Sequence, residues 1–143
     1  MKNSKNIHGT SVAIENNGIL IIGESGKGKS DLALRLIDSG ATLVADDITV
    51  CVSKKNNIFL YPDEQIKGII EIRGVGLMKV QYVEGIELKL VIDLNSKNLE
   101  RLPKKSEKKN IMGIKVPIIF LSAKEASAVA KVKFKLYEEY VEK

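Results

Sequence analysis

Short apolar runs separated by turn residues mark the start of the chain. The stretches "SVAI" (residues 11–14) and "ILII" (residues 19–22) are strand-like, and the Asn-Gly pair of the intervening "ENNG" favours a tight hairpin turn. A helix is expected next, opened by Ser30 and closed by Gly40. Its apolar stripe consists of Leu32, Ala33, Leu36 and Ile37.

The rest of the pattern predicts a strand-rich second half. "TLVA" is a strand, and "ITVCV" and "IFLY" form another hairpin around the polar "SKKNN". We expect a short helix or loop in "DEQIKGIIEIRGVG" (residues 63–76) and a polar surface connection over residues 95–110. Further strands are expected in "LMKVQYV", "LKLVIDL" and "IMGIKVPIIFL", the last with Pro117 at an edge or bulge. A C-terminal helix carries the apolar stripe Ala126, Ala130, Phe134, Tyr137 and Val141.

Length and composition narrow the class of protein. A chain of 143 residues has the size of one domain, so residues 1–143 are expected to form a single mixed α/β domain. No apolar stretch reaches the roughly 18 residues of a membrane-spanning helix, and no charged-then-apolar leader opens the chain. We therefore expect a soluble, cytoplasmic protein without membrane attachment. The lone Cys51 excludes an intrachain disulfide and is interpreted as a small buried hydrophobe.

The formal charge of +5 suggests an acidic partner at first sight. Much of the excess lies in "ERLPKKSEKKN" (residues 100–110), which holds five cations and two anions and has the composition of a solvated loop. The chain also lacks the interleaved aromatic residues on which single-stranded bases stack. We therefore predict no nucleic-acid partner, while contact of this basic segment with an acidic partner stays an alternative.

The stretch "GESGKGKS" carries the clearest chemical signal. It fits the pattern G-x-x-x-x-G-K-[ST] between a predicted strand and a predicted helix. Glycines let backbone N–H groups surround a phosphate, Lys29 adds a cation, and the Ser30 hydroxyl can bind Mg²⁺. The predicted nucleotide-binding residues are Gly23, Glu24, Ser25, Gly26, Lys27, Gly28, Lys29 and Ser30. Lys27 occupies a variable position of the motif and is expected to be solvated. The alternative is a glycine-rich turn without a ligand.

Two adjacent acids, Asp46 and Asp47, end the strand "TLVA" that follows the predicted helix. A phosphate-binding loop needs an acid near its Mg²⁺, often from the end of a neighbouring strand. Adjacent side chains at a strand end point in different directions. One acid can therefore serve the metal while the other faces the phosphate acceptor. A strand-terminating turn with solvated carboxylates is the alternative.

Taken in order, four stretches resemble a known family: "HGT" (residues 8–10), "GESGKGKSDLALRLI", "LVADD" and "EIRGVG" (residues 71–76). They are similar to the catalytic domain of the bacterial HPr kinase/phosphorylases. The later "LVIDL", "ERLP" and "VPIIFLSAKEASAVAKVKFKL" resemble the short single-domain form found in alphaproteobacteria. The resemblance implies a P-loop-containing mixed-sheet fold related to phosphoenolpyruvate carboxykinase. The absence of H-R-D and D-F-G elements agrees, since these mark the eukaryotic protein kinases.

The resemblance also implies an activity and partners. Family members transfer the γ-phosphoryl group of ATP, with Mg²⁺, to a serine of the phosphocarrier protein HPr in the sugar phosphotransferase system. Many also remove that group by phosphorolysis with inorganic phosphate, and they usually form hexamers. On this basis ATP and Mg²⁺ are the expected cofactors, HPr is the expected protein partner, and a homo-oligomer is the expected assembly.

Residue roles follow by motif from the resemblance. Asp47 matches the family's general base, Asp46 the supporting acid on the metal side, and Glu71 a second Mg²⁺ ligand. Arg73, two residues further, would lie on the same side as Glu71 in an extended segment and meet phosphate charge. A surface ion pair at a turn is the alternative for Glu71 and Arg73. His8, the one histidine, matches an active-site histidine, and a solvated ring near the terminus is its alternative.

The chain also departs from the family. Longer members carry an N-terminal regulatory domain, which we expect to be absent here, and a Pro-Gly-Arg-Asn type loop with a catalytic arginine. The corresponding region reads "IIFLSAKEAS", where Lys124 is the available cation and cannot reproduce the forked contacts of a guanidinium. This departure from the family therefore concerns phosphorolysis more than the phosphorylation of HPr. Two other functions stay open, a nucleotide-sensing binding module without phosphotransfer and a small-molecule kinase.

Overall fold

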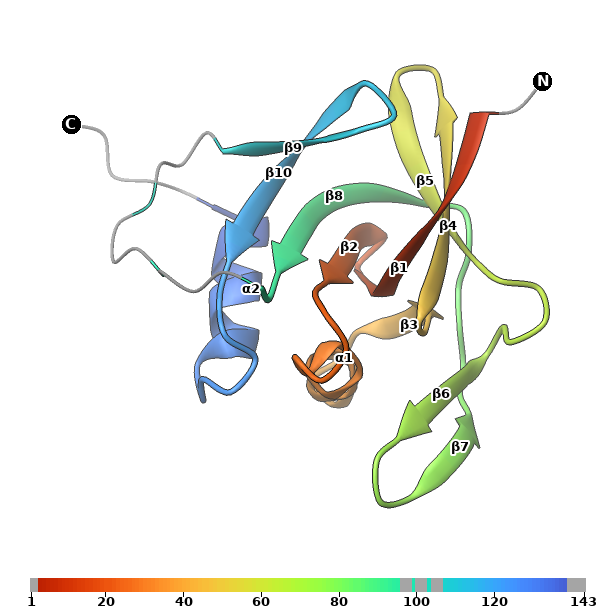
Figure 1. The fold of residues 1–143 in the computed structure, drawn as a ribbon, viewed down its shortest axis with the longest axis vertical. Coiled ribbons are helices and arrows are strands. Elements are labelled where there is room, and N and C mark those ends of the chain that lie inside the picture. The colour runs from red at the N-terminus through yellow and green to blue at the C-terminus, as the bar shows by residue number, and fades with distance from the viewer. Residues whose placement is uncertain (1–2, 96–98, 100–102, 104–106, 139–143) are drawn as a thin grey trace.

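The computed structural model describes residues 3–95, 99, 103 and 107–138. Over these residues the chain forms a mixed α/β fold with a large sheet, a separate two-stranded sheet and two helices (Figure 1). This confirms the predicted fold class. The strands are β1 (Asn3–Ile14), β2 (Asn17–Ile22), β3 (Thr42–Ala45), β4 (Ile48–Lys54), β5 (Asn57–Pro62), β6 (Ile69–Ile72), β7 (Gly76–Lys79), β8 (Ile86–Asp93), β9 (Lys108–Ile111) and β10 (Ile114–Phe120), and the helices are α1 (Lys29–Asp38) and α2 (Ala128–Leu136).

Strand β1 changes its partner halfway along its length. Its first half, from Asn3 to His8, pairs antiparallel with β4, and its second half, from Gly9 to Ile14, pairs antiparallel with β2. The second half also pairs with β3. Because β2 runs parallel beside β8, and β8 contacts β5, the pairings β1–β4–β5–β8–β2 close into a circuit. The point where β1 switches partner lies close to the predicted site residues.

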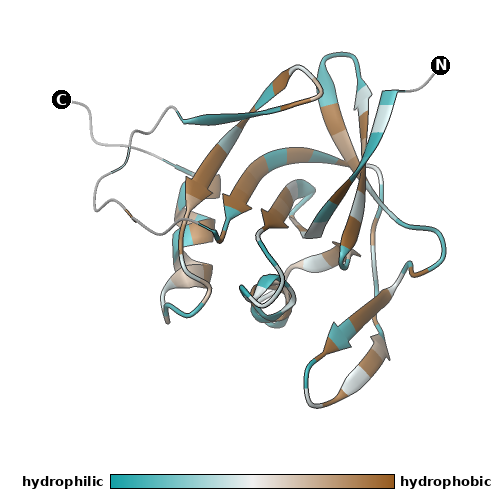
Figure 2. Ribbon diagram, in the orientation of Figure 1, coloured by the Kyte–Doolittle hydropathy of each residue, from teal (hydrophilic) through white to brown (hydrophobic). Residues whose placement is uncertain are grey.

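Two groups of buried side chains stabilise this arrangement. One group lies between the strands β2 and β8 and the two helices, and it includes Leu32 and Leu36 of α1, both fully buried. The other group lies within the bend of the sheet and includes Leu20, Cys51 and Leu60. Figure 2 shows the apolar residues concentrated along the strands, whereas the turns are hydrophilic. Burial of these apolar surfaces is the main force that holds the sheet against the helices.

Helix α1 follows the predicted pattern closely. Leu32, Ala33 and Leu36 are buried, and Asp31 forms an i,i+4 ion pair with Arg35 on the outer face. The chain leaves the helix at Gly40, whose φ of 118° is readily available to glycine alone. The predicted helix is thus confirmed, although it begins at Lys29, one residue earlier than expected, and its last residue is Asp38.

Other predicted elements need correction. The first hairpin turns at Glu15 and Asn16, both with positive φ, so the Asn-Gly pair that follows lies within β2. Residues 63–76, expected as a short helix or loop, contain β6 and the turn into β7. The isoleucines at 69, 70 and 72 favour a strand, and Gly74 and Gly76 take positive φ at the turn. "LMKVQYV" continues as strand only to Lys79.

The C-terminal part agrees with prediction in its elements, but the predicted apolar stripe of the last helix is wrong, because helix α2 begins at Ala128, buries Ala128 and Val132 and leaves Phe134 and Tyr137 exposed. "IMGIKVPIIFL" contains a turn at Met112 and Gly113, so it forms the end of β9 and the whole of β10. Pro117 pairs with Lys108 of β9, and the next residue begins the pairing of β10 with β8. Helix α2 ends at Leu136, whereas Val141 of the predicted stripe and most of residues 95–106 lie outside the described residues. Among the residues that the structure describes, no helix has the length and apolarity needed to cross a membrane.

Cys51 should react slowly with thiol reagents in the folded protein. Its side chain is fully buried, and burial raises the pKa of the thiol to about 11 although Lys5 acts in the opposite direction. Since the thiolate is the reactive form, we expect little reaction with an aromatic disulfide at pH 8 and rapid reaction in concentrated urea. A native rate equal to that of a free cysteine would contradict the burial.

Candidate active site

The glycine-rich loop joins the end of β2 to the start of α1. Gly26 and Gly28 have φ values of 86° and 95°, which favour glycine, and the helix begins with the hydrogen bond from Leu32 N to Gly28 O at 2.9 Å. A Cβ on Gly28 would lie 3.0 Å from the Cβ of Ala123. The second fixed glycine of the motif is therefore required by both backbone conformation and close packing.

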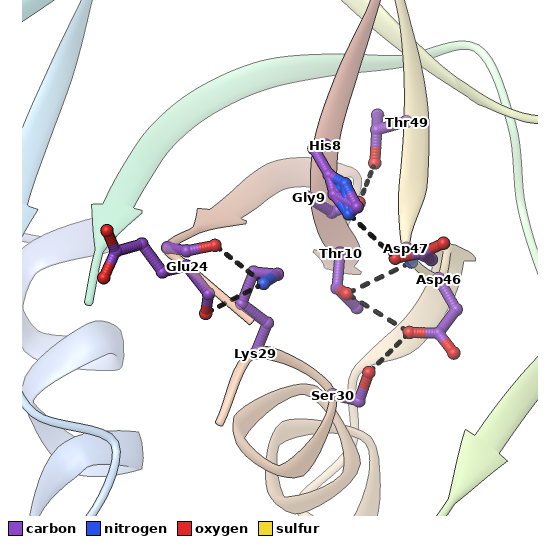
Figure 3. A network of polar contacts seen from close by, with 10 residues as sticks. His8, Gly9, Thr10, Glu24, Lys29, Ser30, Asp46, Asp47 and Thr49 are labelled. Carbon is purple, nitrogen blue, oxygen red and sulfur yellow. Dashed lines mark hydrogen bonds and ion pairs between the residues drawn. The ribbon is translucent and has the colours of Figure 1, made fainter. Parts of the chain in front are cut away.

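Lys29 turns back over this loop. Its Nζ donates to Gly23 O at 2.7 Å and to Glu24 O at 3.3 Å (Figure 3). Glu24 N in turn donates to Asn95 Oδ1 at 2.7 Å. The first residues of the loop are thus held by the motif lysine and by Asn95, which follows β8. Ser25 and Lys27 are exposed, as expected for Lys27.

Asp46 is the buried acid of the adjacent pair. Its carboxylate is 7% exposed and accepts hydrogen bonds from Ser30 Oγ at 2.7 Å and Thr10 Oγ1 at 3.2 Å on Oδ1. Its second oxygen, Oδ2, accepts from Glu71 N at 3.0 Å. Three donors from β1, α1 and β6 offset the cost of burying the charge. Asp46 therefore ties the helix start to two strands far from it in the sequence.

Asp47 has the opposite environment. Its side chain is 62% exposed, and Oδ1 lies 3.2 Å from Nε2 of His8, which is 66% exposed (Figure 3). Asp47 adopts a φ of 70°, an uncommon conformation that aspartate tolerates better than most residues. The two acids thus face different surroundings, as the sequence predicts, although both lie in the sharp turn between β3 and β4.

Thr10 connects the two acids. While its hydroxyl donates to Asp46 Oδ1, the same oxygen accepts from Asp47 N at 3.3 Å. Gly9 N donates to Asp47 O at 2.9 Å, and Thr49 Oγ1 donates to Gly9 O at 3.0 Å. A Cβ on Gly9 would lie 2.8 Å from Ile21 O, so only glycine fits there. The three residues of the "HGT" stretch therefore make different contacts: His8 lies beside Asp47, Gly9 packs closely against Ile21 O, and Thr10 bonds to both acids.

The structure fixes the side chains of Glu71 and Arg73 less firmly than those of the two adjacent acids. Glu71 lies in β6 with an exposed side chain, and its backbone N–H, not its carboxylate, contacts Asp46. Strand β6 ends at Ile72, so Arg73 lies in the turn to β7 and strand alternation does not extend to it. Their side chains remain candidates for phosphate and metal contact.

The residues present fit Mg²⁺ at Ser30 and Asp46. This ion prefers oxygen ligands at 2.0–2.1 Å in an octahedron, in which adjacent ligands lie about 2.9 Å apart. The separation of 2.7 Å between Ser30 Oγ and Asp46 Oδ1 is close to that value. Within the described part of the chain, no group of three or more His, Cys, Asp and Glu residues forms a metal site by itself. A nucleotide phosphate and water would have to complete the coordination.

The segment after β10 packs beside the loop. Arg35 of α1 donates through Nη2 to Ala123 O and through Nη1 to Glu125 O at 3.4 Å. Lys124 lies between these two residues, is exposed, and donates its backbone N–H to Ser122 Oγ at 3.2 Å. The region that departs from the family is thus held next to Gly28, and the part played by Lys124 stays a prediction.

Sequence reasoning assigned no role to Thr10, Asn95 or Arg35. The signal for Thr10 was available, because alternate residues of a strand share a face and His8 and Thr10 are two apart. The contacts of Asn95 and Arg35 join segments 71 and 88 residues apart in the chain. No local pattern marks such pairs.

Comparison with known proteins places the chain in one family. The family described as HPr Serine kinase C-terminal domain matches residues 1–135. The HPr kinase/phosphorylase of Mycoplasmopsis pulmonis is 34% identical over 88% of this chain and 45% of its own length, and that of Caldicellulosiruptor bescii is 38% identical over 86% and 43%. The structure of the Hpr(Ser) kinase/phosphatase from Coxiella burnetii covers 93% of this chain and 94% of its own with a TM-score of 0.78 and 28% identity.

The molecule is thus a mixed α/β domain in which a glycine-rich loop precedes a helix and a buried acid contacts the first turn of that helix. It belongs to the family of the HPr Serine kinase C-terminal domain. The chain spans less than half the length of the curated relatives it matches.

Thr10→Val should destabilise the protein because it removes the hydroxyl and keeps the shape. Asp46 loses a donor and Asp47 N–H loses its acceptor, and leaving buried polar groups unpaired costs about 1–3 kcal/mol. Urea unfolding measures this loss. Thr10→Ser keeps the hydroxyl and should recover most of the stability, whereas a Thr10→Val protein as stable as the native chain would contradict the role of the hydroxyl.

Proposed function

We propose that this chain is an ATP- and Mg²⁺-dependent kinase that phosphorylates a serine of HPr. The observation that carries the proposal is the pair of adjacent acids in opposite environments. Asp46 is buried against the helix-start serine Ser30, while Asp47 is exposed beside His8. The relatives named HPr kinase/phosphorylase support HPr as the acceptor.

In the proposed site, the loop from Gly23 to Ser30 holds the triphosphate. Backbone N–H groups at the start of α1 and the Lys29 ammonium would bind the β and γ phosphates, and Lys29 would leave its present carbonyl partners to do so. Ser30 and Asp46 would bind Mg²⁺, with Glu71 near the same position. When bound, Mg²⁺ neutralises charge on the phosphate oxygens. Arg73 would add further positive charge.

Asp47 is the proposed general base. Its carboxylate takes the proton from the acceptor serine as the serine oxygen forms a bond to the γ-phosphorus and the bond to ADP breaks. His8 lies 3.2 Å from Asp47 Oδ1 and orients that carboxylate. Because most catalysis in phosphoryl transfer comes from positioning and charge neutralisation, the fixed turn that holds Asp47 serves the reaction directly.

The same residues would run the reverse reaction. In phosphorolysis, an oxygen of inorganic phosphate attacks the seryl phosphorus, pyrophosphate forms, and Asp47 returns its proton to the serine oxygen. We further propose a cytoplasmic homo-oligomer, hexameric by resemblance, that acts in regulation of the phosphotransferase system. These features rest on the family and not on geometry.

Asp47→Asn should keep the fold and lose phosphotransfer. Asparagine tolerates the positive φ at this position but cannot accept a proton, and a general base contributes about 10²- to 10⁴-fold. The measurement is the mass shift of one phosphate on HPr with ATP and Mg²⁺. As a matched control, Lys29→Ala should weaken ATP binding as well as transfer. ATP binding without transfer in the native protein would favour the nucleotide-sensing module.

Phosphorolysis can be tested on the product of that reaction. Incubation of seryl-phosphorylated HPr with inorganic phosphate should return unmodified HPr and pyrophosphate if the reverse direction operates. Asp47→Asn should slow it about as much as the forward direction, since one carboxylate serves both. Forward transfer without any pyrophosphate release would define a kinase alone and direct attention to Lys124.

A further inference from the structure

One face of the sheet near the proposed site carries apolar side chains that are only partly buried within the described residues, among them Val50, Val52 and Tyr61. Rows across β1, β4 and β5 follow from the register, in which Asn6 pairs with Val50 and Val50 pairs with Tyr61. Val52 lies two residues further along β4 on the same face. The opposite face of these strands is different, because Cys51 and Leu60 are fully buried there.

This face forms an open hollow of about 430 Å³. Its lining residues are Asn6, Val50, Val52, Tyr61, Pro62, Asp63 and Glu64. The floor is apolar, and the end beyond β5 is acidic. Glu64 pairs with Lys67 at 3.0 Å, and Asp63 Oδ1 accepts from Gln65 N. Two carboxylates and one ammonium leave that end with a net negative charge.

The hollow lies one row of the sheet away from the proposed site. His8 pairs with Ile48, and this row lies next to the row of Asn6, Val50 and Tyr61 on the same face. Neighbouring same-face residues of a strand are about 7 Å apart. His8 in turn contacts Asp47, the proposed base. A serine that reaches Asp47 therefore brings the residues beside it over the hollow.

We propose that this hollow is the docking groove for the polypeptide segment that flanks the acceptor serine. The proposal rests on the proposed function and deepens it. The segment presents an apolar side chain to Val50 and Tyr61. This side chain lies two residues from the serine if the segment is extended, or one turn from it if the segment is helical. A basic side chain of the same segment faces Asp63 and Glu64. Val50 and Tyr61 are specificity-determining residues in this scheme.

A second hollow offers a matched comparison. It has a volume of about 440 Å³, and its lining includes Lys89, Ile114 and Lys115. None of the proposed site residues lines it. Ile114 is half-buried, as Val50 is, and lies in β10. A lysine introduced at Ile114 therefore tests the general effect of replacing a half-buried apolar residue by a charge in a hollow away from the proposed acceptor groove.

The test compares Val50→Lys, Val50→Ile and Ile114→Lys with the native chain. Binding of HPr is measured by calorimetry with Mg²⁺ and a non-hydrolysable ATP analogue, and steady-state transfer gives kcat and KM. We expect Val50→Lys to raise the Kd and KM for HPr about tenfold or more, the scale of losing one buried apolar contact, with kcat and the KM for ATP unchanged. Val50→Ile and Ile114→Lys should resemble the native chain, and thermal unfolding checks each fold.

The outcomes separate the two proposals. Equal HPr binding by Val50→Lys and the native chain overturns the groove, even where phosphotransfer is normal. Absence of HPr binding by the native chain also overturns it. A native chain that binds HPr but transfers no phosphate rejects the kinase, and weaker binding by Val50→Lys would then still support the groove. Equal weakening by Ile114→Lys would contradict the assignment to this hollow.

Discussion

The hydrogen bonds that Asp46 accepts in the interior are the constraint on which the site depends. A buried carboxylate is costly unless donors surround it, and here the donors are Thr10, Ser30 and the backbone N–H of Glu71. These donors come from three elements, so β1, α1 and β6 must meet at one point. The glycine-rich loop receives its position from this meeting, because Ser30 lies in the first turn of α1.

The change of partner strand along β1 allows Asp47 to turn outward. Between the pairings with β4 and β2, the backbone of Gly9 bonds to Asp47 O, and Asp47 turns outward with positive φ. The same irregularity that ends one pairing and begins the next therefore exposes a carboxylate beside His8. Because of this one irregularity in the sheet, Asp46 is buried and hydrogen-bonded whereas the neighbouring Asp47 is accessible.

Local patterns in the sequence predicted the local parts of this arrangement. The stripe through Leu32 and Leu36 identified α1, and the motif glycines identified the loop, because both depend on neighbouring residues. The hairpin of β6 and β7 was missed, since the short apolar stretch at residues 69–72 fits either a strand or a helix by periodicity alone. Strand alternation could have placed Thr10 beside His8, but its bond to Asp46 joins residues 36 positions apart and has no local pattern.

The long sequence separation of these contacts bears on when the site forms during folding. Contacts between Thr10 and Asp46, or between β1 and β4, can form only after a loop of some forty residues closes, and such closure is slow compared with helix formation. The helix and the glycine-rich loop can take shape early without any acid beside them. The backbone geometry of the loop would then precede the arrangement of the two acids, and the exposed carboxylate would acquire its orientation only in the last, cooperative stage of folding.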